Sequence, residues 1–130
     1  MPFFGLVITS VGFLIPTVLA RRRGKKPFSL ACGILTISSF LYHLTVHPLV
    51  RVLDNLVAHT VVVYGISASV WKSLHARDRL RRLGVCCLSA VPIYIYQCKS
   101  RRTHGNESCI WHMLFHVSGQ TCLIIYAIFF

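Results

Sequence analysis

The chain has 130 residues, of which 55% are hydrophobic and 13% are charged, and its net charge is +11. Long uncharged runs exclude a water-soluble enzyme and predict an integral membrane protein with a single domain over residues 1–130. The 14 Lys and Arg residues lie almost wholly in short segments between the apolar runs, where they orient helices in the bilayer. The positive charge therefore reports topology and does not indicate a nucleic acid partner.

Apolar runs follow one another along the chain and predict an all-α, polytopic transmembrane helix bundle with about five spans. In order, the runs cover residues 3–20, 28–46, 49–71, 83–98 and 109–130. The first run is followed, not preceded, by basic residues, so it differs from a signal peptide. Pro16 predicts a kink in it. The fourth run is short for a span and contains Pro92.

Two clusters of basic residues separate the runs, one over residues 21–26 and one over residues 72–82. Cytoplasmic loops carry the excess of Lys and Arg, so both clusters are predicted to be cytoplasmic. With five spans, the N-terminus is then lumenal or outside and the C-terminus is cytoplasmic. The pattern fits the endoplasmic reticulum, the Golgi and the plasma membrane alike.

Polar side chains interrupt three of the runs at one predicted depth. His112 and His116 stand four residues apart at the head of the last run, and Ser39 and His43 repeat this spacing in the second. Residues four apart share one face of a helix. Asp54 follows the turn between the second and third runs. All five residues fall near the lumenal ends of their helices, so we expect them to converge.

This set of side chains has a chemical meaning that no single member has. Three neutral imidazoles can bind a zinc ion and leave one position open, where water is acidified to a pKa of roughly 7. A carboxylate such as Asp54 can take a proton from that water and return it to a leaving group. The Ser39 hydroxyl can stabilise an oxyanion. The sequence thus predicts a hydrolase centre inside the membrane.

Each residue also has a plainer interpretation. The histidine pair of the last run can be a packing or hydrogen-bonded pair within a buried helix. Asp54 can form an ion pair with Arg51, three residues earlier. The hydroxyl of Ser39 can bond a carbonyl of its own helix. The occurrence of all of them at one depth favours the catalytic interpretation.

The same residues resemble the signature of the CREST superfamily of membrane hydrolases and receptors. Ser39 and His43 match its SxxxH motif, Asp54 its aspartate, and His112 and His116 its HxxxH motif. The spacing from His43 to Asp54 is most similar to the alkaline ceramidases, with the adipoQ receptor and haemolysin III group as the second choice.

The resemblance implies that His43, His112 and His116 ligate Zn²⁺, that Asp54 is the general acid and base, and that Ser39 assists the oxyanion. The substrate would be a membrane lipid amide such as ceramide, cleaved to a sphingoid base and a fatty acid in sphingolipid metabolism. The family has seven spans and the ceramidases an acidic N-terminal calcium site, whereas this chain has room for five spans and Asp54 is its first acidic residue.

The sequence therefore predicts a zinc-dependent intramembrane lipid hydrolase that takes its substrate from the bilayer, with a homo-oligomer left open. The alternative is an adipoQ-receptor-like or structural membrane protein that retains a non-catalytic metal site. A third candidate is an ion or metal carrier whose histidines line a path.

Overall fold

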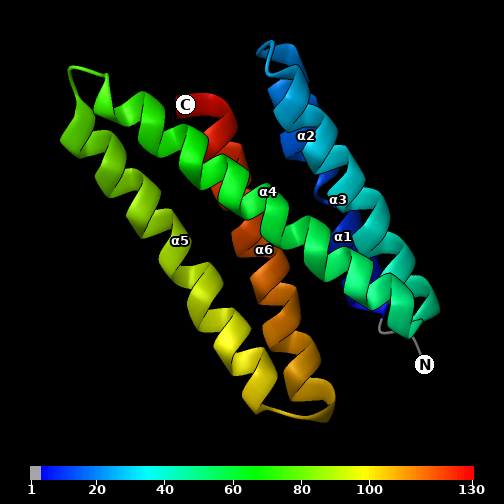
Figure 1. Ribbon diagram of the computed structural model, residues 1–130. Helices are drawn as coiled ribbons and strands as arrows, with labels where there is room; N and C mark the ends of the chain where they lie inside the picture. Colours follow the sequence, from blue (N-terminus) through cyan, green and yellow to red (C-terminus); the bar gives the residue numbers. More distant parts are fainter. Residues whose placement is uncertain (1–3) are drawn as a thin grey trace.

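The computed structural model describes residues 4–130, which are almost entirely helical. The helical segments are α1 (Phe4–Val11), α2 (Leu14–Arg22), α3 (Lys26–Thr45), α4 (Pro48–Leu74), α5 (Arg79–Arg102) and α6 (Gly105–Phe129). Since α1 and α2 form one interrupted helix, the chain folds as a bundle of five long helices (Figure 1). The predicted all-α bundle is confirmed, with a helix over each apolar run.

Four of the five long helices are long and apolar enough to cross a bilayer, namely Phe4–Arg22, α3, α4 and α6. Large apolar side chains such as Leu30, Val63 and Leu88 point outward and are 62–74% exposed. Helix α5 falls outside this set because basic residues at both of its ends confine its uncharged stretch to residues 83–98, short of the roughly 20 residues that a span needs. Their length and composition are compatible with a membrane protein.

The first apolar run is interrupted at Gly12 and Phe13, between α1 and α2. Pro16 lies in the first turn of α2, and a proline ring clashes with the carbonyl four residues before it, here that of Gly12. The chain tightens instead, with backbone bonds from Gly12 N to Thr9 O and from Ile15 N to Gly12 O. The predicted distortion is therefore present, one turn ahead of the proline.

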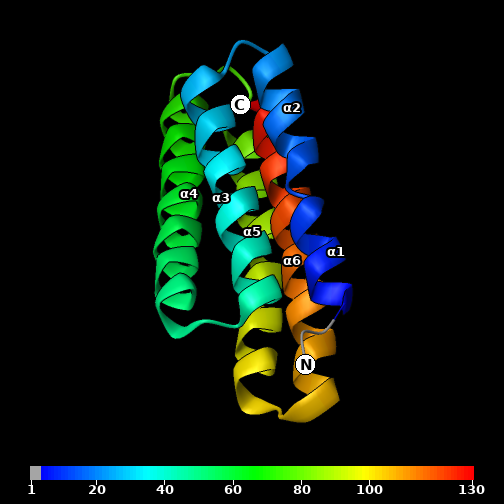
Figure 2. The ribbon, with the colours of Figure 1, turned by 90° about the vertical axis from the view of Figure 1, so that its right-hand side faces the viewer.

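The two basic clusters lie at the same end of the bundle, beside the C-terminal end of α6, and the α3–α4 and α5–α6 turns lie at the opposite end (Figure 2). We call these the basic end and the hairpin end. Carbonyls in the last turn of a helix lack intrahelical partners and attract cations. Three cations donate to carbonyls at the C-terminal end of α6, including that of its C-cap Phe130: Lys25 Nζ to Ala127 O at 2.6 Å, Lys72 Nζ to Phe130 O at 2.6 Å and Arg82 Nη1 to Phe129 O at 2.7 Å.

Small residues let the helices approach closely in the middle of the bundle. Ser10, Ser39, Ser69 and Ser73 are almost fully buried. At Gly65 of α4 an added Cβ would lie 2.9 Å from Cδ2 of Tyr126 on α6. In a bilayer, where apolar helices gain little by leaving lipid, such close contacts stabilise helix association. They draw α4 onto α6 in the half of the bundle that lies towards the basic end.

Towards the hairpin end the helices separate. Helices α4 and α5 are joined at the basic end and diverge from it, so that the start of α4 lies with α3 while the end of α5 lies with α6 (Figure 1). The α5–α6 hairpin is closed by reciprocal bonds, Ser108 Oγ to Ser100 O at 2.8 Å and Ser100 Oγ to Ser108 O at 3.3 Å. The candidate site lies where the two helix pairs diverge.

Candidate metal centre

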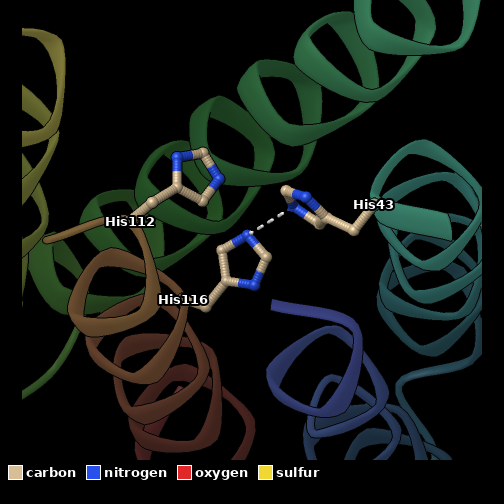
Figure 3. Close-up of side chains that lie close together, drawn as sticks. All are labelled: His43, His112 and His116. Carbon is tan, nitrogen blue, oxygen red and sulfur yellow. Dashed lines mark hydrogen bonds between the residues drawn. The ribbon is translucent and has the colours of Figure 1, made fainter. Parts of the chain in front are cut away.

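Three histidine rings from two helices meet inside the bundle (Figure 3). His43 lies in the last turns of α3, and His112 and His116 lie one turn apart on α6. One ring nitrogen from each of the three lies within 4.8 Å of the other two. His43 and His116 are buried and His112 is partly buried. The structure thus brings together the three imidazoles that the sequence places at one depth.

The end of α3 determines where His43 stands. The helix stops at Val46, a residue in the left-handed region with φ 53°, and His47 precedes Pro48, which begins α4. The ring of His47 accepts a hydrogen bond from Leu49 N at 3.3 Å and caps α4, so it belongs to the α3–α4 turn and not to the histidine cluster. His43, one turn earlier, instead faces α6.

The spacing between two of the rings fits a zinc ion. Nε2 of His43 and Nε2 of His116 are 3.3 Å apart. Two Zn–N bonds of about 2.05 Å at a tetrahedral angle place their nitrogens roughly 3.3 Å apart. Without a cation between them, one of these nitrogens has to carry a proton and donate it to the other. The donor set and this distance are therefore compatible with a tetrahedral metal site.

Thr9 of α1 sets the orientation of His116. Its Oγ1 lies 3.2 Å from Nδ1 of His116 and donates its own proton to Leu6 O at 3.1 Å. Since that proton is used, Oγ1 accepts from Nδ1–H, and the lone pair of His116 is on Nε2, the nitrogen that faces His43. Metal-binding histidines commonly donate their second N–H in this way, which fixes the tautomer.

His112 has a longer contact of the same kind. Nδ1 of His112 is 3.5 Å from Ser100 Oγ on α5, whose hydroxyl donates to Ser108 O. The rings of His43 and His112 meet edge to face, with centroids 5.1 Å apart. The α5–α6 hairpin thus supports the third ring, as α1 supports the second.

Asp54 of α4 is a buried carboxylate on the same cavity as the histidines. Its Oδ1 accepts a hydrogen bond from Ser38 Oγ at 2.9 Å. The ion pair with Arg51 that the sequence allowed is absent: within residues 4–130 the single ion pair joins Arg82 and Asp78 at 2.7 Å. Asp54 is therefore held by a hydroxyl group and not by a cation.

Ser39 lines the cavity but bonds away from the histidines. Its Oγ lies 3.1 Å from Ser10 Oγ, and Ser10 donates its own proton to Leu6 O at 2.8 Å. Ser39 is therefore the donor in the bond between the two serines. The expected bond to its own helix is replaced by a contact between α3 and α1, and its proton is free for another acceptor only after the side chain rotates.

A cavity of about 700 Å³ extends along the inside of the bundle and contains all five predicted residues in its wall. This volume is in the range of pockets that hold small organic ligands. Its wall is formed mainly by α3, α4, α5 and α6. The arrangement can hold an elongated apolar ligand beside three imidazoles and one carboxylate.

Sequence reasoning missed the hydroxyl groups that support the site, on Thr9, Ser10, Ser38 and Ser100. The available signal was two pairs of adjacent hydroxyl residues, Thr9-Ser10 and Ser38-Ser39, within apolar runs. Because a lone hydroxyl in a helix ordinarily bonds its own backbone, that signal is weak.

Comparison of the chain with family models, with characterised proteins and with solved structures gives no match. The resemblance to the CREST superfamily accordingly depends on the motif residues and on nothing else.

Proposed function

We propose that this protein is a zinc-dependent intramembrane hydrolase that cleaves an acyl bond of a lipid, with ceramidase-like amide hydrolysis as the reaction. The observation that supports it most is the convergence of His43, His112 and His116 on a cavity that also contains the buried carboxylate of Asp54. Zinc held by three neutral imidazoles would act as a Lewis acid that acidifies water to a pKa of roughly 7.

Asp54 moves the proton in this proposal. Ser38 occupies Oδ1, and Oδ2 has no hydrogen-bond partner among residues 4–130. No fully buried polar side-chain atom in this part of the chain lacks a partner, so Oδ2 is accessible from the cavity. It can take the proton of the attacking water and deliver it to the leaving amine or alkoxide, which is the ordinary role of a general base and acid.

Ser39 has the smaller role. After rotating away from Ser10, its hydroxyl can donate to the developing oxyanion. Because the bond to Ser10 has to break first, the net stabilisation of the oxyanion is small. Substitution of Ser39 should therefore lower the rate of hydrolysis less than substitution of Asp54.

Thr9 and Ser100 act through the rings that they contact. Thr9 keeps the Nδ1 proton on His116 and turns Nε2 towards the other imidazoles. Ser100 does the same for His112 at a longer distance. Both are positioning residues that hold the ligand set ready for the cation.

The lipid would enter sideways from the bilayer, because its acyl chains already lie there and the bundle separates between α4 and α5 towards the hairpin end. By the positive-inside rule the basic end is cytoplasmic. The histidines would then lie in the lumenal or outer half of the membrane, with the C-terminus in the cytoplasm.

A structural metal site, as in an adipoQ-receptor-like protein, is the second candidate. The observation in its favour is that the cluster joins three helices, with His43 on α3, His116 on α6 and Thr9 on α1. A cation there would stabilise the bundle without any reaction.

Substitution of Asp54 separates the two candidates. We expect purified wild-type protein to contain one zinc per chain and to release fatty acid from labelled ceramide. Asp54→Asn should keep its zinc and lose about 10²- to 10⁴-fold in rate, the usual contribution of a general base. The measurements are elemental analysis and product release.

Asp78→Asn is the matched control, because Asp78 is an exposed aspartate at the basic end. It should keep both zinc and rate. A wild-type protein without metal, or a rate unchanged by Asp54→Asn, would remove the hydrolase proposal.

A further inference from the structure

Two arginines in the wall of the cavity have no role in the site described so far. Arg51 lies in the first turn of α4 and Arg101 in the last turn of α5, both at the hairpin end. Both side chains are exposed and both line the cavity. They therefore lie where the cavity meets the surface at the hairpin end, Arg51 on α4 and Arg101 on α5, and we call this part of the cavity its mouth.

Neither guanidinium is neutralised by the protein. Within residues 4–130 no carboxylate lies within 4 Å of Arg51 or Arg101, and neither makes a hydrogen bond to the chain. The neighbouring cation Lys99 behaves differently, because its Nζ lies over the ring of Trp111, 5.1 Å from the centroid. Arg102 is exposed and is not part of the cavity wall.

The cavity is divided into zones along the bundle. On α4 the cavity wall runs from Arg51 to Asp54, one turn further on, and then past Ala58 and Val62 to Ile66, which lies some 15 residues or about 22 Å from Arg51. On α5 the order from the mouth is Arg101, then Tyr94, then Ala90. The wall is thus cationic at the mouth and apolar at the inner end.

The histidines lie between these zones. On α6, His112 follows the cavity residue Ser108 by one turn, and Leu123 lies about 10 Å beyond His116, in the apolar zone. A lipid with its tail at the inner end and its head at the mouth would place the bond between head and tail at the level of the three imidazoles. The order of zones matches the order of groups in an amphiphile with an anionic head.

We propose that the cavity mouth is a headgroup subsite in which Arg51 and Arg101 bind the phosphate group of the substrate lipid. Guanidinium groups bind phosphate oxygens through paired, charge-assisted hydrogen bonds, and two of them match the charge of a phosphate monoester. The inference rests on the proposed function in one respect, namely that the bond cleaved is an acyl bond. It predicts that, among acyl lipids, those with a phosphate head bind more tightly than uncharged lipids such as ceramide.

The test is equilibrium binding to purified full-length protein in an uncharged detergent. The probes are 1-O-hexadecylglycerol 3-phosphate, its uncharged analogue 1-O-hexadecylglycerol, and inorganic phosphate. The first two share one tail, and their ether linkage leaves no acyl bond to hydrolyse. We expect wild type to bind the phosphate lipid about ten-fold or more tightly than the uncharged lipid, as two charge-assisted contacts should provide.

The variant Arg51→Gln with Arg101→Gln should bind the two lipids equally, while Arg102→Gln, the matched control, should keep the wild-type preference. The variant Arg51→Lys with Arg101→Lys retains the charge and should keep a reduced preference for the phosphate lipid. This result would show that the glutamine variant loses its preference through loss of charge and not through misfolding. Zinc content should be unchanged in all of them.

Equal binding of the two lipids by wild type would overturn the proposal, as would a preference that survives Arg51→Gln with Arg101→Gln or that Arg102→Gln also abolishes. The proposal would also fail if inorganic phosphate bound as tightly as the phosphate lipid, because the site would then recognise a soluble anion and not a lipid headgroup. Because no step of this test needs hydrolysis, it fails or succeeds independently of zinc content and fatty acid release. Failure would leave the hydrolase proposal in place with an uncharged substrate.

Discussion

At the basic end of the bundle the side chains of Lys25, Lys72 and Arg82 donate to carbonyls at the C-terminal end of α6, whereas at the hairpin end the side chains of Arg51 and Arg101 bond nothing in the described chain. Basic side chains thus bond the protein itself at one end of the bundle, whereas at the other end they are free to bind a ligand. Several hydroxyl and imidazole groups towards the hairpin end, among them His43, Ser100 and His112, line the cavity. The difference suggests that stability depends on the basic end and ligand binding on the hairpin end.

The largest expected effect comes from removing an imidazole at the hairpin end. His116→Ala should abolish stoichiometric zinc binding and with it fatty acid release, because a site with two imidazoles leaves the cation underligated. Elemental analysis of the purified protein measures the first effect. His75→Ala is the matched control, since His75 is exposed at the end of α4 and its ring contacts Trp71 O. Full zinc content in His116→Ala would contradict the assignment of the site.

The three histidines were predictable because the chemistry of a bilayer makes polar residues rare within spans, so each one in an apolar run is conspicuous. Helical periodicity then places His112 and His116 on one face, and the turn at Pro48 places His43 at the same level. Depth along a span follows from counting residues, which is why the sequence could place the three histidines at one level.

The partners of these rings were not predictable in the same way. Which helix packs against the face of His116 depends on contacts between residues far apart in the chain, such as Gln120 with the backbone of Thr9. Thr9 lies in α1, just before the break at Gly12, whereas the sequence marks only Pro16. Hydroxyl groups in a helix have a default partner in their own backbone, so nothing local showed that Thr9 and Ser10 reach other helices.

Thr9→Val is expected to have the next largest effect, again at the hairpin end. Valine has nearly the shape of threonine and removes the oxygen that accepts from Nδ1 of His116. Loss of such a supporting contact typically weakens metal affinity about 10- to 100-fold. Competition between the protein and a zinc chelator gives the ratio of affinities.

Thr17→Val is the control for Thr9→Val, because Thr17 lies on the same interrupted helix and its hydroxyl bonds Phe13 O, one turn earlier in the chain. It should leave the affinity at the wild-type value. Equal affinity in Thr9→Val and wild type would mean that the tautomer of His116 is set by something other than α1.

The smallest effect is expected at the basic end, where Lys25→Met should lower stability and leave zinc affinity unchanged. Lys25 donates to Tyr126 O and Ala127 O, and a cation at a helix C-terminus contributes about 0.3–1 kcal/mol. Burial, with the nearby charges of Lys72 and Arg23, lowers the pKa of Lys25, so the ammonium form is held at a cost that offsets part of this contribution. Thermal unfolding in detergent should therefore shift by only a few degrees. Lys26→Met, at the adjacent exposed position, should not shift it, and a loss of zinc in Lys25→Met would show that the two ends are coupled.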